Sequence, residues 1–159
     1  MQFLKILTPL MAGAVLATAV PLLAHAQGTD DSVLTEMSQA FRTRDRKKLT
    51  PLLPQARGHV LEPWAAYWEL KARLDEASPQ EVDAFLARYA GTYQEDRLRN
   101  DLLLLLGQRR DWANFAVHHP QYRMSDDREV RCYALLVDQL KGSTTPPEAV
   151  AEELRRNWY

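Results

Sequence analysis

The chain has 159 residues, with 20 lysine and arginine side chains, 21 acidic side chains and one cysteine. This length is enough for one domain with a hydrophobic core. The near-neutral formal charge of -1 argues against a nucleic-acid partner and against electrostatic docking on anionic lipid, since both need a basic face. One cysteine cannot form a disulfide within the chain, so we expect Cys132 to be a small, half-buried side chain and not a catalytic thiol.

Residues 1–26 have the features of a cleavable signal peptide. Lys5 lies in a short basic region, an apolar stretch covers residues 6–23, and Ala24-His25-Ala26 places small residues where a signal peptidase reads them. A membrane anchor is the alternative, but two prolines and a glycine interrupt the stretch and no basic cluster follows it. We therefore expect an exported domain over residues 27–159 without a stable membrane anchor. Cleavage would leave 19 basic against 21 acidic side chains, a formal charge of -2.

The first expected helix begins at Asp31 or Ser32 and is followed by a basic run. Its apolar face, at helical spacing, contains Val33, Leu34, Met37, Ala40 and Phe41. Residues 42–48, RTRDRKK, are typical of a solvated corner, and Asp45 suits the N-cap of a second helix that ends near Leu53. Nucleic-acid binding is the alternative for this run, but no aromatic residue is interleaved with it and no matching basic face appears elsewhere.

The third expected helix opens at Glu62-Pro63, where proline at the first turn costs no hydrogen bond. Helix-breaking residues precede it, namely Pro51, Pro54 and Gly58. Its apolar face contains Trp64, Tyr67, Trp68, Leu70 and Leu74. Three large aromatic side chains within five residues can stack on a sugar ring, but at helical spacing such a cluster is more often core, which we favour. We expect Glu69 and Arg73 to form an i,i+4 pair on the outer face.

The middle of the chain has the most specific helix signals. Residues 78–81, Ser-Pro-Gln-Glu, form a capping box with proline at the first helical position, and Gly91 ends the helix that follows. Residues 98–107, LRNDLLLLLG, contain five consecutive leucines, which cover every side of a helix. This segment is too short to span a bilayer and has charged flanks. We therefore expect a helix that is buried on more than one face and is stopped by Gly107.

Three further helices are expected toward the end of the chain. The first carries Trp112, Phe115, Ala116 and His119 at helical spacing and ends at Pro120. The second is capped by Ser125 or Asp126 and stops at Gly142, and the third opens at residues 146–148, Pro-Pro-Glu. No segment alternates strictly between apolar and polar residues, so we assign no strands.

The expected helices form pairs that recur along the chain. Val82 of one short helix corresponds to Trp112 of the next, and Leu98 corresponds to Val130 in the same way. A helix–turn–helix period of about 30 to 35 residues is typical of an α-solenoid, in which each pair is covered by the next. The sequence therefore predicts an all-α solenoid of helix pairs. Apolar Leu154 and Trp158 would lack a cover at its end, so we interpret the chain as a fragment that continues beyond Tyr159.

The sequence contains no arrangement that we identify as catalytic, cofactor-binding or metal-binding. The glutamates all fit helix starts or solvated faces, and Asp126 and Asp127 lie at an expected helix N-terminus, where acids stabilise exposed N–H groups. His118 and His119 are adjacent, so on a helix they point about 100° apart, and His59 is isolated in a loop. No phosphate-binding glycine loop appears. We predict no catalytic residue, no cofactor and no metal.

Residues 57–136 carry a series of motifs, LEPWAAYWEL at 61–70, FLARY followed by GTY at 85–93, EDRLRND at 95–101, LLGQRRDW at 105–112 and DREVRCYALL at 127–136. In this order and spacing they closely resemble the N-terminal helical domain of the soluble lytic murein transglycosylases. With the expected signal peptide and a weaker match over residues 33–53, the resemblance covers essentially all of residues 27–159.

The resemblance implies a right-handed α-superhelix that curls into a ring and supports a C-terminal lysozyme-like catalytic domain. That family cleaves peptidoglycan glycan strands in the periplasm, between N-acetylmuramic acid and N-acetylglucosamine, and leaves an anhydromuramoyl end. Its catalytic glutamate is typically followed by serine, and this sequence has no Glu-Ser dipeptide, so no catalytic residue carries over. We expect a scaffold that reaches peptidoglycan through a catalytic domain outside residues 1–159. The alternative is a freestanding periplasmic helical-repeat adaptor that binds a protein partner in its groove.

Overall fold

The structure, a computed structural model, describes the backbone of residues 31–158 and the side chains of residues 31–156. Within this range it contains eight α-helices, two 3₁₀ helices and no strand, which confirms the prediction of an all-helical chain. The elements are α1 (Asp31–Arg42), α2 (Arg46–Leu52), η1 (Leu53–Ala56), α3 (Glu62–Ala72), α4 (Pro79–Arg88), α5 (Tyr93–Gln108), α6 (Trp112–His118), η2 (His119–Gln121), α7 (Arg128–Leu140) and α8 (Pro147–Trp158). The predicted signal peptide, residues 1–26, lies outside the described residues.

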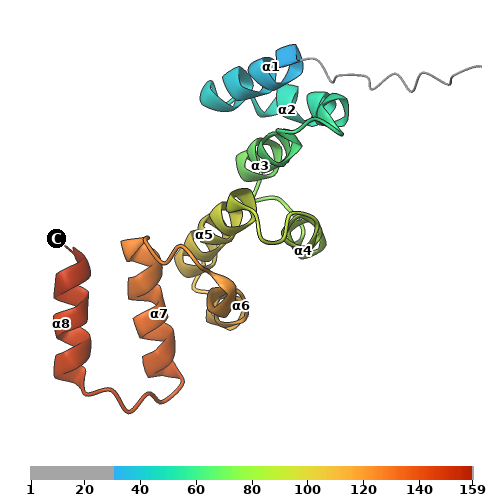
Figure 1. The fold of residues 1–159 in the computed structure, drawn as a ribbon. Coiled ribbons are helices and arrows are strands. Elements are labelled where there is room, and N and C mark those ends of the chain that lie inside the picture. The colour runs from blue at the N-terminus through green and yellow to red at the C-terminus, as the bar shows by residue number, and fades with distance from the viewer. Residues whose placement is uncertain (1–30, 159) are drawn as a thin grey trace, which may run out of the picture.

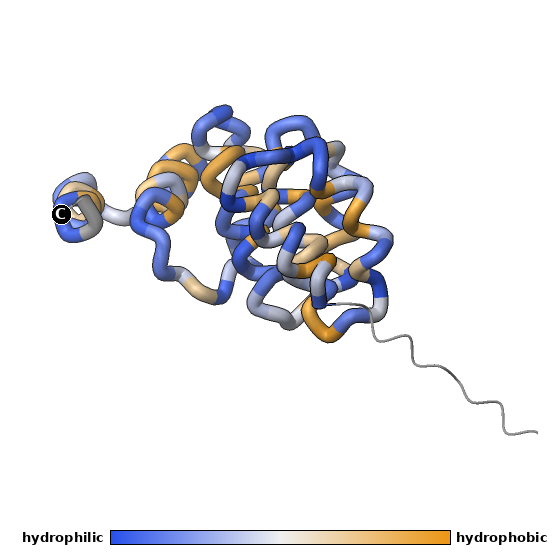
Figure 2. The backbone as a smooth tube through the Cα atoms, turned by 90° about the horizontal axis from the view of Figure 1, so that it is seen from above, coloured by the Kyte–Doolittle hydropathy of each residue, from blue (hydrophilic) through white to orange (hydrophobic). Residues whose placement is uncertain are grey.

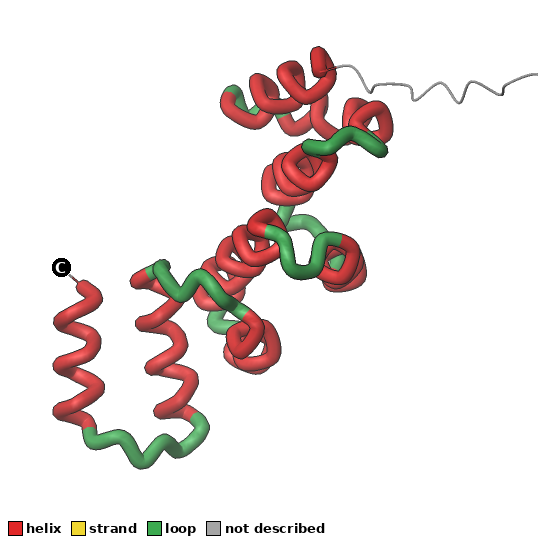
Figure 3. Tube along the Cα trace, in the orientation of Figure 1, coloured by secondary structure: helices red, strands yellow, loops and turns green. Residues whose placement is uncertain are grey.

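The helices follow one another along the molecule in chain order (Figure 1). α1, α3, α5 and α7 form a row in which each helix contacts the next, while α2, α4 and α6 pack beside α3, α5 and α7. Short loops join neighbouring helices (Figure 3), and the loop from α7 to α8, residues 141–146, is as long as the one that precedes α7, residues 122–127. Seen from above, α8 stands apart from the packed body, beside α7 (Figure 2). Central helices are therefore covered on more sides than the last one.

The leucine helix forms the centre of the larger hydrophobic core. Leu98, Leu102, Leu103 and Leu106 are buried, and Leu104 and Leu105 pack against them partly buried, which confirms the predicted burial on more than one face. A second, smaller cluster lies between α1, α2 and α3 and consists of Val33, Leu34, Met37, Ala40, Leu49, Ala56 and Ala65. Burying a leucine side chain contributes roughly 1.5–3 kcal/mol, so the row is held together chiefly by this apolar contact.

Three helices that pack beside the row begin at equal intervals. Asp45, Ser78 and Asp111 are the N-caps of α2, α4 and α6, so the interval from 45 to 78 equals the interval from 78 to 111. Ser78 and Glu81 form the predicted capping box, in which each side chain accepts a hydrogen bond from the other residue's backbone N–H. The spacing lies within the period predicted from the sequence.

The structure corrects three predicted helix boundaries. Gly107 does not stop the leucine helix but lies inside α5, where a β-carbon would come within 2.2 Å of the Tyr133 ring, so its role is close helix packing. Pro51 lies inside α2 instead of breaking the chain after it. The N-cap of α7 is Asp127, whose carboxylate accepts hydrogen bonds from the backbone N–H groups of Glu129 and Val130, and not Ser125 or Asp126.

Candidate functional site

A layer of charged side chains is buried in the first half of α5. Glu95 is 3 % exposed, Asp96 2 % and Arg99 4 %, and Asn100 and Asp101 are buried beside them. Glu95 lies in the first turn of α5, which agrees with the prediction that the glutamates lie at helix starts or on solvated faces, but it is buried there. Buried charges are stable only when they are paired and hydrogen-bonded, so the partners of this layer define its role.

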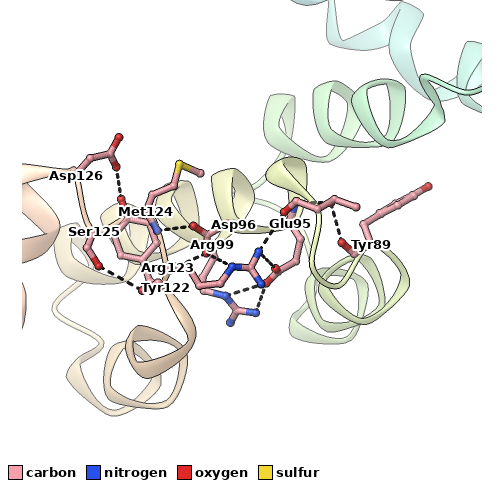
Figure 4. Close-up of polar contacts among 10 residues, drawn as sticks. Tyr89, Glu95, Asp96, Arg99, Tyr122, Arg123, Met124, Ser125 and Asp126 are labelled. Carbon is pink, nitrogen blue, oxygen red and sulfur yellow. Dashed lines mark hydrogen bonds and ion pairs between the residues drawn. The ribbon is translucent and has the colours of Figure 1, made fainter.

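Several partners of the layer lie in the segment that leads into α7 (Figure 4). Both Asp96 oxygens accept backbone N–H groups, from Arg123 at 2.9 Å and from Met124 at 2.7 Å. Glu95 accepts hydrogen bonds from Arg99 through Oε1 and from Arg123 Nη2 through Oε2, the latter at 2.8 Å. Because both Glu95 oxygens are bound by guanidinium groups, this carboxylate is arranged as a structural ion pair and not as a proton donor. We call this set the α5 latch.

A similar set of contacts joins α2, α3 and α4. Glu69 accepts a hydrogen bond from Thr50 Oγ1 at 2.9 Å and from Arg73 Nε at 2.7 Å, and Arg73 Nη1 binds Glu81 at 2.7 Å. The predicted Glu69–Arg73 pair thus forms, but Glu69 is only 4 % exposed because α2 covers it, so its placement on the outer face is corrected. These contacts fix how the successive helices sit against one another.

A hydrogen bond between buried side chains also ties α3 to α5. The Tyr67 hydroxyl donates to Asp101 Oδ2 at 2.8 Å, and Lys71 Nζ lies 2.7 Å from the other Asp101 oxygen. Burial, and then the neighbouring Asp101 charge, raise the pKa of Tyr67 above its usual range. Tyr67 is therefore a core residue with a satisfied hydroxyl, as the core interpretation of the aromatic cluster predicted.

The other aromatic residues of the cluster form a row on the boundary between core and solvent. Ring centroids lie 5.7 Å apart for Tyr93 and Trp64, 6.0 Å for Trp64 and Trp68, and 6.3 Å for Trp68 and Phe41. Trp64, Trp68 and Phe41 are half-buried and Tyr93 is 55 % exposed. We call these four residues the aromatic row. It crosses α5, α3 and α1, three helices whose juxtaposition the sequence does not reveal.

A groove of about 440 Å³ lies between α1 and α3, beside the aromatic row. Its apolar wall is formed by Trp68, Leu34 and Leu61. Its polar lining comes from one helix face, with hydroxyl, amide and charged groups of Asp31, Thr35, Ser38, Gln39 and Arg42. An aromatic wall flanked by several hydrogen-bonding groups suits a ring that has one apolar face and hydroxyls at its edge.

His59, His118 and His119, the histidines in the described part of the chain, do not come together in a metal site. The ring of His119 stacks on Phe115 at 5.4 Å, and burial lowers the pKa of His118 and of His119 below their usual range. His59 is not isolated, because its Nε2 lies 2.8 Å from Asp31 Oδ1 and its Nδ1 accepts the backbone N–H of Leu61. Within residues 31–158 no three histidine, cysteine or acidic side chains are grouped as metal ligands would be.

Asp126, Asp127 and Cys132, which were also considered from the sequence, have contacts that stabilise the fold. Asp126 accepts a hydrogen bond from the Tyr122 hydroxyl at 2.8 Å, and Asp127 caps α7, so the two acids have different partners. Cys132 is half-buried as predicted, and burial raises the pKa of its thiol, which disfavours the reactive thiolate. None of these residues forms a nucleophile with a base beside it.

No helix in the described part of the chain is long and apolar enough to cross a membrane. Comparison with known proteins adds no relative: no family model matches the chain, and no curated protein and no solved structure is significantly similar to it.

Proposed function

We propose that this protein is the helical scaffold of a periplasmic lytic transglycosylase, a non-catalytic part that guides peptidoglycan glycan strands toward a lysozyme-like catalytic domain. That domain would cleave between N-acetylmuramic acid and N-acetylglucosamine and leave an anhydromuramoyl product. The motif series over residues 57–136 supports this proposal through its resemblance to the soluble lytic murein transglycosylases. The row of α1, α3, α5 and α7 and the equal spacing of the three N-caps support a repeating arrangement of helix pairs, and the resemblance implies that it is a right-handed α-superhelix.

The observation that carries the proposal is the aromatic row and the groove beside it. Trp68 offers a half-buried ring at the groove wall, and Ser38 and Gln39 lie opposite with groups that form hydrogen bonds to sugar hydroxyls and acetamido groups. The row continues to the exposed Tyr93, so successive sugars of a strand have successive aromatic contacts. Core packing accounts for Tyr67 but leaves the exposure of Tyr93 unexplained.

The α5 latch and the contacts of Glu69 support the same role, because a guide for a rigid polymer needs fixed spacing between its helices. Asp96 binds the segment before α7 through two backbone N–H groups, and Glu69 joins α2 to α4 through Thr50 and Arg73. Such charge-assisted hydrogen bonds are shorter and stronger than neutral ones. They hold the helices in one arrangement even where apolar contact alone would permit sliding.

The test is a titration with soluble glycan strands freed of their peptides, followed by tryptophan fluorescence. We expect saturable binding that Gln39→Ala weakens about fivefold, the effect of one lost hydrogen bond, and that Trp68→Leu weakens further. Gln80→Ala is the matched control, since this exposed glutamine lies on α4 outside the groove. Equal affinity of Gln39→Ala and Gln80→Ala, or no saturable binding at all, would contradict the proposal.

The second candidate is a periplasmic adaptor that binds a protein partner, and one observation favours it. Leu136, Leu140 and Leu154 are exposed on α7 and α8, with Leu140 at 62 %. These two helices pack against each other, and exposed apolar side chains that gather on one surface mark interaction sites. A partner recovered from periplasmic extract by the native chain and lost with Leu140→Glu, without any glycan affinity, would favour the adaptor. Recovery of no specific partner would exclude it.

A further inference from the structure

A pocket of about 480 Å³ lies at the corner where α1 meets α2. Its base is apolar, formed by Phe41 and Ala72. Four cationic side chains and no acidic side chain complete its lining, namely Arg42, Arg44, Arg46 and Lys71. The basic run is exposed as the sequence predicted for a solvated corner, but the fold brings Lys71 and Ala72 of α3 to it, which the sequence did not indicate. We call this the corner pocket.

Two of the four cations have their charge compensated. Arg46 Nη2 lies 2.9 Å from Glu76 Oε2 and 3.7 Å from Asp75 Oδ1, and Lys71 binds Asp101. Arg42 and Arg44 differ, because no acidic side chain in the described part of the chain lies within ion-pair distance of either. The corner pocket therefore carries two uncompensated positive charges above an apolar base.

The chain contains the same corner a second time, and there three of the four cationic positions hold uncharged side chains. Arg44 and Arg110 both have a left-handed backbone, with φ of 58° and 57°, and each precedes an aspartate that caps the next helix. When Asp45 is aligned with Asp111, the positions of Arg42, Arg46 and Lys71 are occupied by Gln108, Trp112 and Val137. The turn therefore does not need Arg42, Arg46 or Lys71, and a structural role in the turn does not explain these three side chains.

The apolar base of the pocket restricts which kind of ligand would fit it. Phe41 is held in place by stacking on Trp68, with centroids 6.3 Å apart and planes inclined by 26°, so its remaining surface is a fixed apolar wall. Inorganic anions alone would leave this wall unused. The pocket therefore suits a ligand with an apolar part that covers this wall and a group that carries two negative charges.

We propose that the corner pocket binds a small organic phosphate, with its apolar body against Phe41 and Ala72 and its phosphate between Arg42 and Arg44. A phosphate ester carries up to two negative charges near neutral pH, equal to the two uncompensated guanidinium groups. Arginine is the side chain that best matches phosphate, because its planar fork donates two parallel hydrogen bonds. The volume is within the range of small-molecule sites.

The experiment is isothermal titration calorimetry of the full chain with 1-naphthyl phosphate, 1-naphthol and inorganic phosphate. We expect 1-naphthyl phosphate to bind at one site at least about tenfold more tightly than either fragment, because only it uses the wall and the charges together. Equal affinity for inorganic phosphate, or for naphthol, overturns the proposal, since one half of the pocket would then be irrelevant.

Paired variants separate the pocket from the turn and from overall charge. Arg44→Gly and Arg110→Gly make the same backbone change, and glycine adopts a φ near 58° without strain, so both variants fold. We expect Arg44→Gly to weaken binding of 1-naphthyl phosphate about tenfold, the effect of one charged hydrogen bond, and Arg110→Gly to leave it unchanged. Lys47→Gln removes a charge next to the pocket without lining it and should also be neutral.

A second experiment distinguishes a free organic phosphate from a lipid headgroup as the ligand. Vesicles of phosphatidylglycerol in phosphatidylcholine are tested by co-sedimentation with the same variants. Binding to vesicles that Arg44→Gly and Lys47→Gln reduce equally, with no affinity for 1-naphthyl phosphate, overturns the proposal in favour of general charge attraction to a surface. Loss of 1-naphthyl phosphate binding specific to Arg44→Gly supports it whether or not vesicles bind.

Discussion

The succession of a long helix, a corner, a seven-residue helix, a 3₁₀ turn and another long helix occurs twice, as α1–α2–η1–α3 and as α5–α6–η2–α7. The two corners agree closely, with Asp45 at φ -84°, ψ 77° and Asp111 at φ -82°, ψ 71°. Their sequences, FRTRDRKKL at 41–49 and GQRRDWANF at 107–115, share little beyond an Arg-Asp pair. The pair and a buried apolar residue four positions on, Leu49 or Phe115, are enough to repeat the backbone.

What differs between the corners is the space beside them. Phe41 in the first corner stacks on Trp68, whereas Gly107 at the equivalent place leaves room for the Tyr133 ring to approach the helix backbone. The first corner therefore keeps a pocket, and at the second the Tyr133 ring lies directly against α5. One position thus decides whether the repeated backbone is used for an open surface or for close packing.

The largest expected effect comes from placing a side chain in the second corner. Gly107→Ala would put its β-carbon 2.2 Å from the Tyr133 ring, so α5 and α7 must separate. Overpacking of this kind typically costs about 1–3 kcal/mol. We expect the free energy of unfolding, measured by urea denaturation, to fall by an amount near the upper end of this range. In a Tyr133→Ala background the clash is gone, and the same substitution should become stabilising by about 0.5–1 kcal/mol, as for glycine in a helix. A loss of stability in both backgrounds would show that the ring contact is not the cause.

A smaller effect distinguishes the two caps. Asp111 accepts a hydrogen bond from the backbone N–H of Asn114, whereas the Asp45 side chain makes no such bond at α2. Asp111→Ala should therefore reduce the free energy of unfolding by about 1 kcal/mol, the usual value of a side-chain cap, and Asp45→Ala by only a few tenths. Urea denaturation at neutral pH measures both. Equal costs for the two variants would mean that Asp45 caps α2 in solution.

The sequence predicted the helices, their order and most of their apolar faces, because capping residues and helical periodicity are local signals. Ser78 and Glu81 are an example, since both partners of the capping box lie within one turn. Gly107 was misread because a glycine near the end of a helix pattern marks either a stop or a close contact, and only the position of Tyr133 decides between them. Asp127 was missed as the cap because three residues of similar capping tendency are adjacent there.

The candidate site was the least predictable part, because its contacts join segments far apart in the sequence. Glu95 was interpreted as an acid at a helix start or on a solvated face, and Asp96 was not singled out. One signal was present: these acids precede the leucine run within the same helix, and a helix that is covered on several sides also covers its polar residues. Their partners lie in the segment before α7 and follow no local rule. The aromatic row and the corner pocket likewise required α1 to lie against α3.

The smallest expected effect is a pH dependence of the free energy of unfolding, which again distinguishes α1–α2–η1–α3 from α5–α6–η2–α7. With Asp45 aligned on Asp111, His118 and His119 occupy the positions of Leu52 and Leu53. At these two positions only the α5–α6–η2–α7 succession therefore has side chains that bind a proton. Burial lowers the pKa of both histidines from 6.5, and the Arg99 charge contributes to the shift at His118. Below pH 6.5 the unfolded chain therefore binds protons before the folded chain does. The free energy of unfolding decreases as pH falls through this window, and the contribution of the two histidines to stability is fully present above it.

His118→Leu with His119→Leu, which copies Leu52 and Leu53, should flatten this slope in urea titrations between pH 7 and pH 5. An unchanged slope would place the pH dependence elsewhere, and a slope that the His118 change alone flattens would assign it to the residue beside Arg99.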